Sequence, residues 1–234
     1  GVDFVIANGE NAAGGKGLTP GTAGELFSSG IDVLTGGNHS FQHRDAYPLY
    51  DEDERVIRPL NLPPGVPGRG CGVYPSSQGP VAVLNLLGRV FMKDADCPFR
   101  AVDTAIGQLR DQAAVLIVDI HAEATSEKQA MLHHLDGRIS ALIGTHTHIP
   151  TADARISDCG TGFISDVGMT GPYASVIGVE PDMVLKQMLT GLPVKYRTAE
   201  GDVRISALQV DIDPDTGRAL SVNLVQDPDW RRAP

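Results

Sequence analysis

Short apolar runs alternate with amphipathic segments along the first two thirds of the chain. Buried strands are predicted by continuous apolar runs at residues 2–7, 31–35, 81–86, 115–120 and 139–143. Helices are predicted between them by apolar residues at helical spacing in 19–29, 99–113 and 126–135. Strands that alternate with helices are typical of βαβ units, so we predict an α/β fold with a parallel sheet.

Two of these helices begin at residues that can cap a helix. Thr19 precedes Pro20, which suits an N-cap followed by the first helical position. Ser126 is expected to cap the helix that follows. The last third of the chain differs, because residues 203–212 and 219–225 alternate apolar and polar positions as antiparallel hairpin strands do.

Polar side chains follow four of the predicted strands. They are Glu10 and Asn11, Asn38 and His39, His121, and the pair His146 and His148. Parallel strands place their carboxyl ends on one edge of a sheet, so these residues can converge. One carboxylate, amide oxygens and imidazoles suit zinc, iron(II) or manganese better than calcium. A carboxylate with His and Asn on either side suits two ions about 3.5–4 Å apart, which can clamp a phosphoryl group and generate hydroxide from water.

The spacing of His146 and His148 carries a further expectation. Residues i and i+2 of extended backbone point the same way. If the backbone stays extended beyond the apolar run, both imidazoles face one ion or two adjacent ions.

Composition narrows the class of protein. At 234 residues the chain forms one large domain or two small ones, and its net charge of −10 offers no basic surface for long nucleic acid. No run approaches the ~18 apolar residues of a membrane span. Cys71, Cys97 and Cys159 are odd in number and widely spaced, which favours a reducing cytoplasm over a disulfide framework.

Several strings of residues resemble a known family. Gly-Asn-His at 37–39 and Gly-x-His-x-His at 144–148 resemble motifs of calcineurin-like metallophosphoesterases. The longer strings at 8–17, 121–128, 144–148 and 165–172 are similar to the YmdB-type branch, the 2′,3′-cyclic-nucleotide 2′-phosphodiesterases. The resemblance implies a single domain over residues 1–234 with the metallophosphoesterase four-layer sandwich, in which helices flank central β-sheets.

The resemblance also implies a role for each candidate residue. Glu10 would bridge two divalent metal ions, either iron, manganese or zinc. Asn38, His121 and His146 would complete the shell of one ion. His148 and Asn11 would serve the other ion, and His39 would protonate the leaving oxygen.

The implied activity is hydrolysis of 2′,3′-cyclic nucleotides to 3′-nucleotides by attack of a metal-generated hydroxide on phosphorus. A phosphomonoesterase is one alternative, because the same centre serves both reactions. A metal-binding or nucleotide-binding regulatory protein with little turnover is the other. The expected partners are a small nucleotide and further copies of the chain.

Two departures from the family pattern raise questions about the site. The family opens with a strand and a Gly-Asp motif, whereas this chain begins directly in an apolar run, so we expect that the first strand is missing. Many relatives carry an acidic residue where Ser40 stands, so the group that orients His39 is not identified.

Some residues keep two interpretations. Asn11 could stabilise a turn instead of binding metal, and His39 could contact a metal-bound oxygen without transferring a proton. Glu123 and Asp166 could orient metal-bound histidines or cap local turns. We expect Lys128 to be solvated and not in contact with phosphate.

Overall fold

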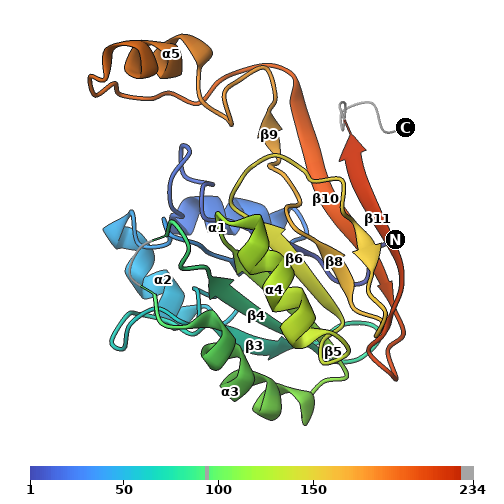
Figure 1. The fold of residues 1–234 in the computed structure, drawn as a ribbon. Coiled ribbons are helices and arrows are strands. Elements are labelled where there is room, and N and C mark those ends of the chain that lie inside the picture. The colour runs from blue at the N-terminus through green and yellow to red at the C-terminus, as the bar shows by residue number, and fades with distance from the viewer. Residues whose placement is uncertain (93–94, 228–234) are drawn as a thin grey trace.

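The computed structural model describes residues 1–92 and 95–227 as a mixed α/β fold whose central sheet is flanked by helices (Figure 1). The largest sheet has the strand order β3-β4-β5-β6-β8-β7. Its parallel strands are β4 (Val81–Leu87), β5 (Val115–His121), β6 (Ala141–Thr145) and β8 (Gly162–Ile164). The edge strands β3 (Cys71–Tyr74) and β7 (Arg155–Ile156) are antiparallel to their neighbours.

Two helices connect the parallel strands. They are α3 (Pro98–Arg110), between β4 and β5, and α4 (Thr125–Leu135), between β5 and β6. Val102 of α3 and Met131 of α4 share one hydrophobic cluster with Leu84 and Val118 of the strands. Val83 of β4 lies in a different cluster on the opposite face, so the strand is buried on both faces and can be apolar at consecutive positions.

A second, two-stranded parallel sheet precedes the large one in the chain. It consists of β1 (Ile6–Asn8) and β2 (Val33–Thr35), joined by α1 (Pro20–Ser28). A short 3₁₀ helix (Arg44–Ala46) and α2 (Tyr47–Glu52) follow. Leu34 of β2 packs in the cluster that contains α1 and α2, whereas Val33 packs in a cluster with Val83 of the large sheet.

The C-terminal part forms a third sheet with the order β11-β10-β9. Its strands are β9 (Gly171–Pro172), β10 (Val203–Ile212) and β11 (Ala219–Asp227). The last two pair as the predicted antiparallel hairpin. Helix α5 (Pro181–Thr190) lies between β9 and β10 in the chain and stands apart from the rest of the fold (Figure 1).

The structure confirms one of the two helix caps. The side chain of Thr19 accepts the N–H of Thr22 in a reciprocal capping box. The prediction for Ser126 is wrong, because α4 begins at Thr125 with Ala124 at the N-cap position and no side-chain cap bond. Strand β3 and helix α2 were not expected from the apolar pattern. Among the described residues, no helix combines the length and apolar character needed to cross a membrane.

Candidate metal centre

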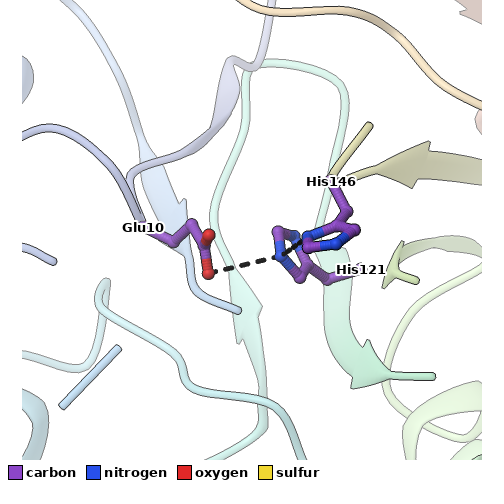
Figure 2. A group of neighbouring side chains, drawn as sticks. All are labelled: Glu10, His121 and His146. Atoms are coloured by element: carbon purple, nitrogen blue, oxygen red, sulfur yellow. Dashed lines mark hydrogen bonds and ion pairs between the residues drawn. The ribbon is translucent and has the colours of Figure 1, made fainter. Parts of the chain in front are cut away.

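The carboxyl ends of β1, β2, β5 and β6 bring most of the predicted ligands together. Glu10 lies two residues beyond β1, His121 is the last residue of β5, and His146 follows β6 directly. One ligand atom from each of these three residues lies within 4.8 Å of the others, an arrangement that could hold a metal ion. Figure 2 shows the Glu10 carboxylate and the two imidazoles pointing toward one another.

Nε2 of His121 is at the centre of this group. It lies 3.3 Å from Oε2 of Glu10 and 3.0 Å from Nδ1 of His146. Oδ1 of Asn38 is also 3.0 Å away from it. Ligand atoms about 3 Å apart are expected around a single ion whose bonds to nitrogen and oxygen measure about 2.1 Å.

The hydrogen bonds behind His121 assign its tautomer. Thr145 donates its only hydroxyl hydrogen to Oδ1 of Asp119 at 2.8 Å. The same hydroxyl lies 3.0 Å from Nδ1 of His121, so it must accept a hydrogen from that nitrogen. Nε2 therefore carries the lone pair, and it is this nitrogen that faces Glu10, Asn38 and His146.

The other two histidines follow the same logic. Nε2 of His146 lies 3.0 Å from the Glu123 carboxylate, and Nδ1 of His148 lies 3.0 Å from the carbonyl oxygen of Ile177. Carboxylate and carbonyl oxygens accept hydrogen, so each of these nitrogens carries the ring proton. Nδ1 of His146 and Nε2 of His148 are left with lone pairs. Two lone pairs 3.0 Å apart, on His121 and His146, repel each other unless a cation lies between them.

Glu10 supplies the negative charge of the group. Its side chain is 2 % exposed. Burial alone would raise the pKa of Glu10, but the neighbouring His121 and the hydrogen bonds donated by the ring and main-chain N–H groups of His39 outweigh it and hold the pKa well below its usual range. The carboxylate is therefore ionised, as a metal ligand must be.

The structure identifies the group that contacts His39. Nδ1 of His39 lies 3.0 Å from Oε1 of Glu10 and 3.2 Å from Oδ1 of Asn11. Both oxygens accept hydrogen, so Nδ1 is protonated, and Nε2 is the nitrogen left for other contacts. The main-chain N–H of His39 also donates to Glu10, at 3.0 Å. Ser40 has a separate part, because its hydroxyl bonds both the N–H and the carbonyl of Gly37.

Gly37 has no room for a side chain. A Cβ at this position would collide with the Glu10 carboxylate and with the His121 ring. The turn after β2 therefore passes directly over the ligand group, and this explains the glycine before Asn38 and His39.

The backbone of His146 and His148 is not extended, contrary to the condition set for the pair. Their φ angles are 105° and 68°, in the left-handed region, so the backbone is not extended beyond β6. The two rings consequently face different neighbours. His146 contacts His121 and Glu123, whereas Nε2 of His148 lies 3.3 Å from Nδ2 of Asn11.

Asp166 has the second of its two predicted roles, whereas Lys128 does not lie where the sequence predicted. Asp166 is buried and accepts the main-chain N–H of Thr147, so it contacts the turn between the two histidines and not an imidazole. The prediction that Lys128 is solvated is wrong, because it is 1 % exposed and paired with Asp166 at 2.8 Å.

A family model described as YmdB-like protein matches residues 1–225. The chain belongs to the YmdB-like family. A 2′,3′-cyclic-nucleotide 2′-phosphodiesterase from Bacillus subtilis (strain 168) is 42% identical over 222 residues, which are 95% of this chain and 84% of that relative.

Two crystal structures of similar proteins share the fold of this YmdB-like chain. A hypothetical protein from Thermus thermophilus superposes with a TM-score of 0.91 at 44% identity, covering 96% of this chain and 87% of the other. A phosphatase from Mycoplasma pneumoniae superposes with a TM-score of 0.88 at 32% identity, covering 97% and 82%.

Asp119, a buried carboxylate outside the predicted set, links the strands that carry the candidate ligands. Asp119 lies in β5 and accepts hydrogen bonds from Asn8 of β1, Thr35 of β2 and Thr145 of β6. A carboxylate within the apolar run 115–120 was the signal in the sequence. Burial raises the pKa of Asp119, while the nearby His121 and these hydrogen bonds oppose the rise.

Replacing Thr145 with Val tests the tautomer assigned to His121. Thr145→Val keeps the shape of the side chain and removes the hydroxyl between Asp119 and His121. We expect Mn²⁺ affinity to fall about 10- to 100-fold, because partners of this kind orient metal-binding histidines. Competition with a fluorescent chelator measures the affinity, and circular dichroism checks the fold.

The matched control for this prediction is Thr147→Val, which leaves the main-chain N–H that contacts Asp166 in place. It should bind Mn²⁺ as the wild type does. Unchanged affinity in Thr145→Val, with the fold intact, would contradict the assignment.

Proposed function

We propose that this YmdB-like chain is a metal-dependent phosphodiesterase that hydrolyses 2′,3′-cyclic nucleotides to 3′-nucleotides. One observation carries the proposal: the outer ring nitrogens of His121, His146 and His148 each lie 3.0 Å from an oxygen, an arrangement that leaves a lone pair of each ring facing inward. The buried, ionised Glu10 lies beside the first two. The similarity to the Bacillus subtilis 2′,3′-cyclic-nucleotide 2′-phosphodiesterase supports the choice of substrate.

Two groups of residues suit two divalent ions, which we propose are iron, manganese or zinc. Glu10, Asn38, His121 and His146 would hold one of them. Asn11 and His148 would hold the other, together with Glu10 as the bridge. When bound, such ions lower the pKa of water and neutralise charge on a phosphoryl group.

We propose that His39 donates a proton to the leaving oxygen. Glu10 holds the Nδ1–H of His39, which fixes the ring and leaves Nε2 to hold a second proton. The ring is 29 % exposed, so a substrate can reach it. The 2′-oxygen of ribose leaves as a strongly basic alkoxide, and a proton from Nε2 would lower the barrier to its departure.

The proposal also covers the fold class of the chain and its place in the cell. We propose the four-layer sandwich of metallophosphoesterases, since Val33 and Val83 join the two parallel sheets in one cluster while α3 and α1 belong to two other clusters. The free thiols of Cys71, Cys97 and Cys159 support a reducing, cytoplasmic setting.

Helix α5 supports a homo-oligomer. Leu185, Met188 and Leu189 follow the i, i+3, i+4 spacing of one face of α5, and they are 51 %, 75 % and 84 % exposed. Leu192, which lies just beyond the end of the helix, is 63 % exposed. An apolar face of this kind usually marks a contact with another chain. We propose that the partner is a second copy of the protein.

Comparing substrates in the wild type tests the function. The protein loaded with Mn²⁺ should convert 2′,3′-cyclic nucleotides to 3′-nucleotides and should turn over the 2′- and 3′-monophosphates more slowly. Removing metal with a chelator should abolish turnover, and adding Mn²⁺ should restore it. Faster hydrolysis of the monophosphates would indicate a phosphomonoesterase, whereas metal binding without turnover would indicate a regulatory protein.

Changing the leaving group tests His39. His39→Ala should slow hydrolysis of a 2′,3′-cyclic nucleotide by about 10²–10⁴-fold, the usual contribution of general acid catalysis. The loss with bis-p-nitrophenyl phosphate should be much smaller, because nitrophenolate leaves without a proton. Equal losses with both substrates, with bound metal unchanged, would remove His39 from the role of acid.

A charge on helix α5 tests self-association. Leu189→Glu should lower the molar mass measured by light scattering, because it places a carboxylate in the apolar face. Leu220→Glu is the matched control, since Leu220 is 64 % exposed on β11. A wild-type monomer, or the same mass in all three proteins, would contradict the interface.

A further inference from the structure

The first turn of α4 contains two adjacent buried charges. Glu127 and Lys128 are 7 % and 1 % exposed. The Lys128 ammonium lies 2.8 Å from Oδ2 of Asp166, which is itself 1 % exposed. Removing the charges of Lys128 and Asp166 from water costs free energy, and the attraction between the two charges offsets that cost only partly. A buried pair of this kind therefore calls for a reason other than stability.

Asp166 connects this pair to the metal-binding turn. Its Oδ2 accepts the main-chain N–H of Thr147 at 2.9 Å, and its Oδ1 accepts that of Gly168 at 2.9 Å. Thr147 lies between His146 and His148, whose left-handed backbone costs free energy in residues other than glycine. The turn between them persists only if neighbouring groups hold it.

Lys128 can reach Asp166 because the residue beside its side chain, Gly144, has no side chain of its own. A Cβ on Gly144 would lie 3.0 Å from Cδ of Lys128, and it would also collide with the Ser165 main chain. Glycine at the end of β6 thus leaves room for both the lysine side chain and the segment that leads to Asp166. The segment is also held from the other side, since Val167 donates its N–H to the Gly144 carbonyl at 2.9 Å.

Glu127 acts in parallel on a different loop. Its carboxylate accepts the main-chain N–H groups of Arg89 and Val90, which follow β4. The start of α4 thus fixes the loop after β4 through Glu127, and the loops after β6 and β8 through Lys128 and Asp166.

We infer that Lys128 is a positioning residue for the metal site. By fixing the Asp166 carboxylate, it holds the Thr147 N–H and so sets the different directions of His146 and His148. The inference rests on the proposed function only in taking these two histidines as metal ligands. The competing explanation is that the pair serves the fold alone.

The single variant Lys128→Met separates these explanations. It leaves the Asp166 charge buried without its partner, so thermal stability should fall. Mn²⁺ affinity, measured by competition with a fluorescent chelator, should fall at least about 10-fold. Leu135→Ala is the matched control, because it removes a buried side chain from the far end of the same helix. It should lower the melting temperature with little change in Mn²⁺ affinity.

Equal weakening of Mn²⁺ binding in Lys128→Met and Leu135→Ala, at equal loss of melting temperature, would overturn the inference. Wild-type affinity in Lys128→Met would do the same. If the wild type itself binds no Mn²⁺, the proposed function fails first, and the two failures are thereby distinguished.

The double variant Lys128→Met with Asp166→Asn keeps the test valid if the single variant does not fold. Removing both charges of a buried pair should restore much of the stability. The amide that replaces the carboxylate would offer one acceptor oxygen to two main-chain N–H groups, so the turn would stay poorly held and Mn²⁺ affinity would stay low. Recovery of affinity together with stability would show that the pair serves only the fold.

Discussion

One buried carboxylate holds the site-bearing strands together. Asp119 belongs to β5 and accepts hydrogen bonds from side chains of β1, β2 and β6. Each of these four strands ends at a candidate ligand, so their carboxyl ends must stay in register for the ligands to meet. The main-chain hydrogen bonds cannot do this alone, because β1 and β2 belong to a different sheet from β5 and β6. The cost of burying the Asp119 carboxylate is offset by hydrogen bonds from three donors. Because hydrogen bonds depend on direction, they also fix how the strands lie relative to one another.

The hydrogen-bond acceptor behind each imidazole decides which ring nitrogen carries the proton, and therefore which nitrogen is free to bind a metal ion. Thr145 accepts the ring N–H of His121, Glu123 that of His146, and the Ile177 carbonyl that of His148. The three acceptors come from β6, from the residues after β5 and from the segment before α5. The lone pairs of the three rings are thus set by groups outside the candidate ligand set, and the ligands alone describe only part of the site.

The sheet edge at which the candidate ligands gather was predictable from the local sequence pattern. The directions of the individual side chains at that edge were not. Glu10, Asn38 and His121 follow apolar runs, and parallel strands bring such positions together. The direction of His146 and His148 was not predictable, because a left-handed backbone depends on support from Asp166 and Lys128 far along the chain. Lys128 resembles any surface lysine until its partner is known. The capping residue Thr19 was predictable because its partners lie within one turn of the helix.

The long sequence separations within the site have a consequence for how the protein folds. Asn11 and His148 are 137 residues apart, and Asn8 and Asp119 are 111 apart. Closing such long loops costs entropy before any contact compensates for it, so the ligands can meet only after both parallel sheets have assembled. A zinc finger folds around its ion because its ligands are close in sequence. Here the order is reversed, and the full set of candidate ligands comes together only in the assembled fold.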